Sequence, residues 1–306
     1  MRFNEKVILL AEEATYGTGA SLSSANYQRV FDLNITPEGE EITDEAERGY
    51  EGAFESIPHG EHVSISYKTH LFGSGTAGTP PPFASALLAC RLAEVIDPGV
   101  SVTYVLASDM GGSAAATVRI GNNLHEIAGM RGMVEIVFEK GVPKLSWQFK
   151  GLWQAPSHTA AAMPAVDNSP WLNFVPTGPG RTTNASLHGQ SVKPFSLSLN
   201  PGNEPVYDES LTTAEILFSG RNGSGKGQIE APTLDVINFF ERASDRSHGP
   251  LSISHGPVGS RATVACPNVQ IKKPVYTKLD SGNVGYDIDF VLLPNAGNDE
   301  FSLMFD

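Results

Sequence analysis

Residues 134–149 read Val-Glu-Ile-Val-Phe-Glu-Lys-Gly-Val-Pro-Lys-Leu-Ser-Trp-Gln-Phe, and this stretch decides the fold class. Apolar residues occupy every second position on both sides of a turn at Gly141-Val-Pro143. Because successive side chains of a strand point to opposite faces of a sheet, this alternation gathers the apolar side chains on one face. The stretch therefore predicts a β-hairpin with one buried face.

The composition extends this prediction to the whole chain of 306 residues. Glycine (31) and proline (21) are plentiful, and charged residues make up only 18%. Such a composition suits many short strands joined by turns better than a helical bundle. We therefore expect a mainly β protein, long enough for one large domain or two of ordinary size.

Two glycine–serine–glycine turns indicate that the same unit occurs twice. Gly73–Gly75 precedes Pro82 by seven residues, and Gly223–Gly225 precedes Pro232 by the same spacing, so both landmarks recur after 150 residues. An apolar run at helical spacing follows each proline, and proline suits the first turn of a helix. These two predicted helical runs cover Phe83–Ile96 and Leu234–Ala243.

Further landmarks follow in the same order in both halves. They are His62–Lys68 and Ala214–Phe218, then Gly112–Val118 and Gly259–Val264, then Leu145–Phe149 and Tyr286–Phe290. Order shared over several landmarks is the signature of an internal repeat. We expect a tandem duplication of a β-sandwich or barrel unit flanked by one helix, with the first unit at 1–153 and the second at 191–306.

Residues 154–190 are predicted to connect the two units. Proline and glycine interrupt any regular pattern there. The stretch also contains Trp171, Leu172 and Phe174, so part of it should pack against the body. The C-terminal residues 299–306 are apolar enough to dock on a neighbouring element.

Residues 38–61 form an acidic block that separates two strand-like segments. Nine acids lie there against one base: Glu38, Glu40, Glu41, Asp44, Glu45, Glu47, Glu51, Glu55 and Glu61, with Arg48. Such a block is not expected to form a packed strand, and an exposed, mobile loop is the default interpretation. Its position between strands indicates a long hairpin excursion, and loops of that length are usually functional or disordered.

Charge, cysteine content and apolar runs exclude several classes of protein. The net charge of −13 argues against a basic nucleic-acid-binding surface. The only early apolar run, Val7–Ala11, is too short for a signal-peptide core or a membrane span, so we expect a soluble protein made in the cytoplasm. Cys90 and Cys266 lie in apolar stretches and are expected to be buried, reduced thiols rather than a disulfide or metal pair.

The candidate chemical motifs are weak, and we expect neither an enzyme nor a cofactor or metal site. Gly220–Lys226 approaches a phosphate-binding loop, but Gly227 stands where the magnesium-binding hydroxyl belongs, so a strand-to-helix turn is the preferred interpretation. His59 and His62 lack the spacing of a structural zinc site. The chain has no Gly-x-Ser-x-Gly elbow and no cysteine beside a base.

The succession of landmarks resembles the major tail tube proteins of long-tailed bacteriophages. The similarity covers residues 5–155 best: the opening Ala11–Gly19, the acidic hairpin, the strand Ser64–Leu71, the Gly-Ser-Gly turn and the run from Phe83. The second half joins the resemblance through its similarity to the first. The order of these landmarks carries the resemblance.

The resemblance implies a structural role in a virion tail, after assembly in the host cytoplasm. Subunits form rings, rings stack, and one sheet from each unit joins a barrel around a channel through which DNA passes without specific binding. The implied partners are further copies of the chain and other tail proteins: the tape measure, the tail terminator and the distal tail protein. A long loop contacts the adjacent ring, a role that falls on residues 38–61 here. No membrane partner is implied.

The doubled length departs from the commonest family pattern of six single-unit subunits in a ring. Three two-unit chains would supply the same pseudo-sixfold ring; the alternative is six chains with the second half outside. An acidic lumen would repel phosphate and keep DNA mobile. Two rival interpretations remain: another self-assembling or surface all-β protein, such as a secretion-system tube or virion decoration protein, and a nucleotide-binding enzyme that rests on Gly220–Lys226.

Overall fold

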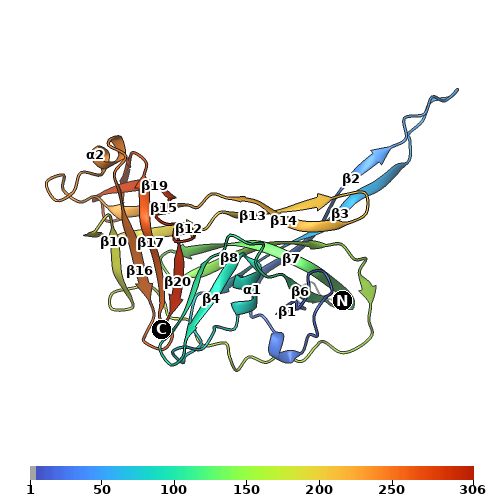
Figure 1. Ribbon diagram of the computed structural model, residues 1–306, viewed down its shortest axis with the longest axis horizontal. Coiled ribbons are helices and arrows are strands. Elements are labelled where there is room, and N and C mark those ends of the chain that lie inside the picture. Colours follow the sequence, from blue (N-terminus) through green and yellow to red (C-terminus); the bar gives the residue numbers. More distant parts are fainter. Residues whose placement is uncertain (1–4) are drawn as a thin grey trace.

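The computed structural model describes residues 5–306, so the first four residues of the predicted first unit lie outside the described part of the chain. Strands account for 51% of the protein and helices for 5%, and a large antiparallel sheet dominates it, which confirms the mainly β prediction (Figure 1). Pairing links eighteen strands into one network, and two further strands form a separate hairpin.

The elements before the proline-rich stretch follow one another in short steps. They are β1 (Lys6–Glu12), the 3₁₀ turn η1 (Ser24–Asn26), β2 (Phe31–Thr43), β3 (Ser56–His70), α1 (Ala84–Ala89), β4 (Leu92–Asp97), β5 (Ser101–Leu106), β6 (Ala114–Ile120), β7 (Asn123–Phe138), β8 (Lys144–Leu152) and β9 (Ser157–His158).

The later elements are again mostly strands. They are β10 (Thr182–Leu187), β11 (Gln190–Ser191), β12 (Pro194–Asn200), β13 (Asn203–Glu209), β14 (Ala214–Arg221), β15 (Ser224–Glu230), α2 (Phe239–Ser244), β16 (His248–His255), β17 (Ala262–Ile271), β18 (Val275–Lys278), β19 (Val284–Leu292) and β20 (Ser302–Phe305).

Strand pairing follows one order in the first group of elements and the same order in the second. In the first group β2 pairs β3, β3 pairs β8, β8 pairs β7, β7 pairs β6 and β6 pairs β1. In the second group β12 pairs β15, β15 pairs β19, β19 pairs β17, β17 pairs β16 and β16 pairs β10. Every one of these pairings is antiparallel.

Two contacts between strands join the groups. β7 pairs with β12 edge to edge, with Val137 opposite Ser198 and Ile136 opposite Leu199. β20 lies between β17 and β5 and pairs with both, so the chain's last strand closes back on the first group. The predicted docking of the C-terminal residues is therefore confirmed.

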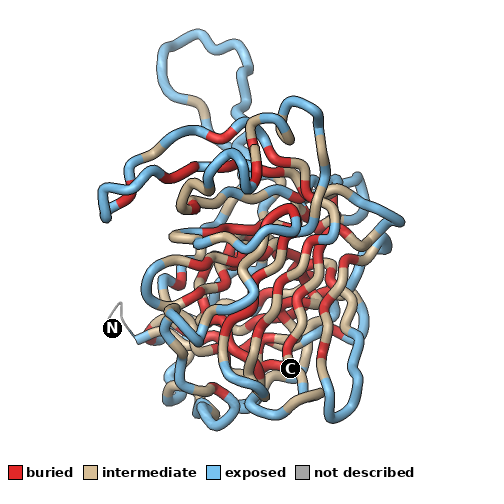
Figure 2. The backbone as a smooth tube through the Cα atoms, turned by 90° about the vertical axis from the view of Figure 1, so that its left-hand side faces the viewer, coloured by how far each residue is buried: buried red, intermediate tan, exposed pale blue. Residues whose placement is uncertain are grey.

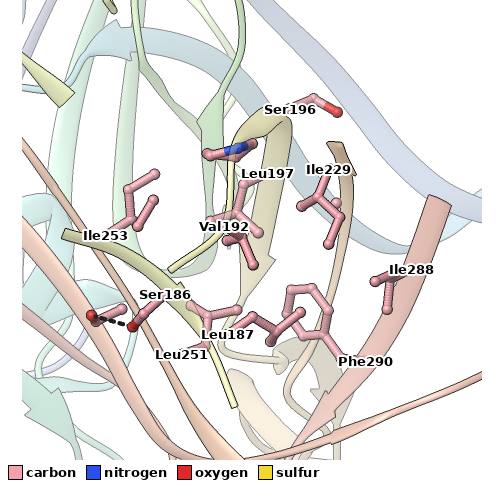
Figure 3. A pocket seen from close by; sticks show the side chains of 14 residues that line it. Ser186, Leu187, Val192, Ser196, Leu197, Ile229, Leu251, Ile253, Ile288 and Phe290 are labelled. Atoms are coloured by element: carbon pink, nitrogen blue, oxygen red, sulfur yellow. Dashed lines mark hydrogen bonds between the residues drawn. The ribbon is translucent and has the colours of Figure 1, made fainter. Parts of the chain in front are cut away.

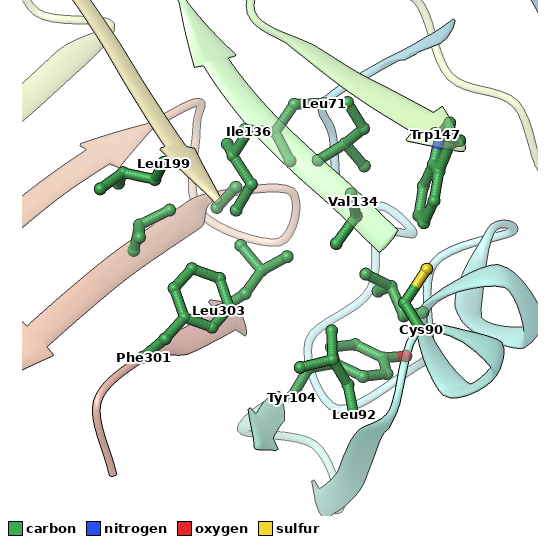
Figure 4. Close-up of a cluster of buried hydrophobic side chains, with 14 of the residues drawn as sticks. Leu71, Cys90, Leu92, Tyr104, Val134, Ile136, Trp147, Leu199, Phe301 and Leu303 are labelled. Atoms are coloured by element: carbon green, nitrogen blue, oxygen red, sulfur yellow. The ribbon is translucent and has the colours of Figure 1, made fainter. Parts of the chain in front are cut away.

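One hydrophobic core runs through both groups. Trp147, Phe149 and Ile136 are at most 1% exposed, which confirms the buried face predicted for the opening hairpin, now β7 and β8. Figure 4 shows Val134 and Ile136 of β7 facing the same cluster as Leu199 of β12 and Leu303 of β20. Figure 2 shows burial concentrated along the strands of the body, whereas the peripheral loops are exposed.

Both helices are shorter than predicted. The run expected as a helix from Phe83 to Ile96 divides into α1 and β4, because Arg91 adopts a left-handed backbone (φ 61°) and the chain then pairs with β5. The second expected helix, Leu234–Ala243, begins at Phe239, where the Asn238 side chain accepts hydrogen bonds from the amides of Phe240 and Glu241. Caps and a left-handed residue, not apolar spacing, set these boundaries.

The landmarks used to align the halves mostly occupy different elements. Gly73–Gly75 follows β3, whereas Gly223–Gly225 leads into β15. Ala214–Phe218 lies in β14 of the separate hairpin, not in a counterpart of His62–Lys68. Gly112–Val118 leads into β6 and Gly259–Val264 into β17, which occupy different places in the pairing order; only the closing strands, β8 and β19, correspond.

Two smaller predictions are confirmed. Trp171, within the stretch 154–190 expected as a connector, is 5% exposed and donates its indole N–H to the Tyr27 carbonyl (3.1 Å), so this stretch is partly ordered. β10 also lies inside that stretch and pairs with β16. Cys90 and Cys266 are buried and free. Burial raises the pKa of both thiols, that of Cys266 to about 12.

Candidate functional site

The acidic block forms the outer half of a long hairpin that projects from the body (Figure 1). β2 and β3 stay paired as far as Thr43 opposite Ser56, so only residues 44–55 form a loop. The long excursion is confirmed, but the expected loop is too long, because residues 38–43 and 56–61 form paired strands, mostly exposed, instead. A two-stranded ladder there needs no packing, since its acids other than Glu38 are exposed to water.

Glu38 secures the base of this hairpin. Its carboxylate lies 3.0 Å from His62 Nε2 and 3.7 Å from Lys150 Nζ of β8. A hydrogen bond from Ser64, helped by the charges of Lys150 and His62, lowers the pKa of Glu38 against the opposing effect of burial. Within residues 5–306, Glu38 is the one member of the predicted acidic set that forms a salt bridge to a strand outside the hairpin, namely β8.

The other acids of the predicted set are exposed along the hairpin and around its tip. They are Glu40, Glu41, Asp44, Glu45, Glu47, Glu51 and Glu55. Arg48, the single base, lies over the ring of Phe54 at 4.1 Å and donates to the carbonyl of Ala53 (3.3 Å). The tip therefore combines a cation held on an aromatic ring with several exposed carboxylates nearby in the sequence, and Tyr50 is 72% exposed.

A second hairpin braces the first. Among the described residues β13 and β14 pair only with each other, and they lie across β7 and β8. The ring of Tyr207 stacks on His62 at 4.6 Å between centroids, and Arg131 of β7 donates to the carbonyl of Ile216 (2.7 Å). Sequence reasoning missed this arm. Its signal was the alternating pair of segments around the polar turn at residues 210–213.

One face of the joined sheet is polar. Side chains opposite one another across paired strands share a face, and the register places Ser66 opposite Gln148, and Lys226 between Ser198 and Asp289. The other face carries the core residues. The polar face thus runs across both groups of strands, and the β7–β12 junction makes it continuous.

The charges on this polar face are mixed. Lys150 lies near Glu38, Lys68 lies 2.8 Å from Asp32, and Lys226 lies opposite Asp289. Each of these three lysines therefore lies beside a carboxylate, whereas the dense acidic excess lies on the projecting hairpin.

An apolar cavity of about 30 Å³ lies between β10 and β16 on one side and β12, β15 and β19 on the other. Figure 3 shows Leu197, Ile229, Ile253 and Phe290 pointing into it. The hydroxyls drawn beside it, Ser186 and Ser252, hydrogen-bond to each other at 3.1 Å. A space of this size holds about one water molecule, so it is a packing defect rather than a ligand site.

The weak motifs have structural surroundings that differ from those expected. Gly220–Lys226 connects β14 to β15, so it is a strand-to-strand turn rather than the strand-to-helix turn predicted. His59 lies 4.0 Å from Glu209, and His62 lies 3.0 Å from Glu38. Within residues 5–306, no cluster of three or more His, Cys, Asp or Glu side chains could hold a metal ion.

No protein-family model matches the chain, and the search of curated proteins finds no relative. Among the described residues no helix is long and apolar enough to cross a membrane. The functional conclusion therefore rests on the geometry of the sheet, its two hairpins and its edges.

Proposed function

We propose that the protein is a structural subunit of a bacteriophage tail tube, in which three chains form a pseudo-sixfold ring and rings stack around a DNA channel. One observation carries the proposal. The same antiparallel pairing order occurs twice, and the β7–β12 junction joins the two series edge to edge. A chain that already joins two such sheets edge to edge has the arrangement expected of one segment of a ring.

Tandem duplication is part of this proposal. β2, β3, β8, β7, β6 and β1 correspond in pairing order to β12, β15, β19, β17, β16 and β10. A helix follows the second strand of each series, and a hairpin leaves between the first and second strand of each: the outer part of β2–β3, and β13–β14. Agreement at this many positions supports two copies of one unit better than shared composition does.

The open edges of the joined sheet support ring closure. Within residues 5–306, β2 pairs only with β3, and β18 pairs only with β19. Exposed edge strands invite association with further chains, and closure into a barrel removes them. Val275 and Tyr276 on β18 are 65% and 63% exposed, as expected of an edge that a partner covers.

In this proposal the polar sheet face lines the channel. Its lysines lie beside carboxylates, so few cations are free to hold phosphates through counterion release. DNA would then pass without specific binding through a lumen of mixed charge. The lumen proposed here is less acidic than the net charge alone suggests, because much of the acidic excess lies on the projecting hairpin.

The projecting hairpin is proposed to contact the adjacent ring. Replacing residues 44–55 with Asn-Gly would join Thr43 to Ser56 by a two-residue turn that suits a paired hairpin. We expect this variant to fold and form rings that do not stack. A matched control replaces residues 210–213, the turn of the bracing hairpin, with the same dipeptide. Tubes of unchanged length from the 44–55 variant would remove the inter-ring role.

Negative-stain electron microscopy and light scattering of the purified protein test the whole proposal. We expect hollow stacks with threefold end views and a smallest assembly of three 32.6 kDa chains. Closed rings that never stack, even with the tape-measure and terminator proteins of the same virus, would favour a decoration protein. A strictly monomeric protein under all these conditions would overturn the proposal.

A further inference from the structure

The junction inside the chain specifies the junction between chains. We propose that the open edge of β2 in one copy pairs antiparallel with the β17–β18 edge of the next copy, with Asn34 opposite Thr277. This inference rests on the proposed ring and adds the edges and the register that close it.

The internal template is the pairing of β7 with β12. There Phe138, Val137 and Ile136 lie opposite Leu197, Ser198 and Leu199. β12 is the first strand of the second series, and β7 is the fourth of the first, where its outer part extends past its pairing with β6. The equivalent partners are β2, the first strand of the first series, and β17 with its continuation β18, which hold the fourth place in the second.

The register on the β2 side follows from the next strand. Ile65 of β3 lies opposite Phe149 of β8, and Gly225 of β15 lies opposite Phe290 of β19. Ile35 pairs with Ile65, as Leu199 pairs with Gly225. Ile35 thus corresponds to Leu199 and Asn34 to Ser198. Leu33 and Leu197, the next pair along, are both 8% exposed.

The register on the β17–β18 side follows from β19, which pairs with both of these strands. Arg131 lies opposite Lys150, as Gln270 lies opposite Val291. Beyond Ile271 the edge strand contains one extra residue before β18 resumes pairing, so Tyr276 opposite Tyr286 corresponds to Ile136 opposite Leu145. Thr277 then takes the place of Val137, and Lys278 that of Phe138.

Side-chain chemistry along the two edges is complementary in this register. Ile35 falls opposite the exposed ring of Tyr276, an apolar cross-strand pair. Toward one end, Glu38 falls near the exposed Lys272 and Lys273; toward the other, Lys278 falls opposite Leu33, next to Asp32 along β2. In the single chain the Lys6 ammonium donates to the carbonyl of Leu33 (3.0 Å), so a flexible side chain covers part of the β2 edge.

The contact is head-to-tail rather than two-fold, because two different edges meet. Such heterologous contacts form closed rings when the rotation between copies closes. The rotation between the two series inside one chain would be repeated between chains. A second copy of the chain is therefore the partner that both edges fit.

Disulfide trapping tests the register. In the Asn34→Cys/Thr277→Cys double variant, opposed residues of an antiparallel pair lie about 4.5–5.5 Å apart at Cα, within disulfide range. We expect mild oxidation to give covalent dimers and closed trimers on non-reducing gels. An equimolar mixture of the two single variants should stop at the dimer. The native thiols are buried and should not contribute.

Two control variants make the result specific. Val137→Cys/Ser198→Cys places the pair in the internal junction and should cross-link within one chain, which calibrates the geometry. Asn34→Cys with Lys272→Cys lies out of register and should cross-link at least tenfold more slowly. Rings in micrographs without the Asn34–Thr277 cross-link, or with equal out-of-register trapping, would overturn this inference and leave the ring proposal standing. Absence of both rings and cross-links would overturn both.

Discussion

The two halves of the joined sheet pair in the same order but are filled in different ways. In the first half Tyr67 of β3 lies opposite Trp147 of β8, and both rings are fully buried. At the matching place in the second half, Gly227 of β15 lies opposite Ile288 of β19, next to the small cavity. The same strand order therefore accommodates very different side-chain volumes, because backbone pairing and alternation set it.

The hairpins that leave the two halves of the sheet differ in direction. β2 runs without a break into the projecting hairpin, whereas β12 ends at Asn200 and the chain turns before β13. Gly202 makes that turn with φ 80°, and a Cβ there would lie 2.2 Å from the backbone of Asn222. The tight crossing turns the second arm back over β7 and β8, while the first arm extends into solvent.

The largest expected effect comes from removing an aromatic side chain from the core of the first half. Trp147→Ala removes a ring that packs on Phe83, Tyr67 and Phe149 and whose N–H donates to Thr69 (2.9 Å). We expect a loss of about 3–5 kcal/mol in the free energy of unfolding. Urea denaturation measures it. Ile288→Val, the matched change in the second half, should cost about 0.5–1.5 kcal/mol. Equal losses at both sites would contradict the asymmetry.

Sequence alone predicted what depends on alternation. The β7–β8 hairpin and its buried face are visible because Val134, Ile136, Leu145 and Trp147 stand at every second position. The projecting hairpin was visible for the same reason: paired apolar segments flank the acids. Element boundaries that a single residue sets were not visible in the sequence. Arg91 is an example, because its left-handed backbone divides a continuous apolar run into a helix and a strand.

The candidate interfaces were less accessible to sequence reasoning. The acidic hairpin was located by its charge. The bracing arm was not, because Ala214–Phe218 has the alternation of a core strand, and its pairing with β13 is visible only in the structure. The β7–β12 junction depends on a contact between residues about sixty positions apart in the chain (Val137 and Ser198). No local pattern encodes which edge meets which.

A smaller effect sharpens the comparison within β15. A Cβ at Gly225 would lie 2.2 Å from the Phe290 ring and 2.7 Å from the Ser198 carbonyl. A Cβ at Gly227, toward the cavity, has its nearest neighbours at 3.3 Å. We expect Gly225→Ala to cost about 1–3 kcal/mol through overpacking, and Gly227→Ala to change stability by less than about 1 kcal/mol. Thermal unfolding of both variants tests this. A larger loss of stability for Gly227→Ala than for Gly225→Ala would show that the cavity has no room for a methyl group.

The smallest expected effect concerns Glu38, which anchors the projecting arm and has no acidic counterpart in the second half, where Gly202 turns the chain. Its folded pKa is lowered, so its contribution to stability is present above the unfolded value of about 4.3 and is lost as pH falls through the lower folded value. We expect Glu38→Gln to lower the free energy of unfolding slightly at pH 6 and to have no effect near pH 2.5.

Urea titrations of both proteins at the two pH values measure this difference, and a matched control separates it from general acid effects. Glu41→Gln changes an exposed carboxylate on the same strand, opposite Pro58, that takes part in no salt bridge within residues 5–306. The control should therefore track the unmodified protein at both pH values. If Glu38→Gln also tracked it, the contacts with Lys150 and His62 would not hold the arm, and the bracing hairpin alone would set its direction.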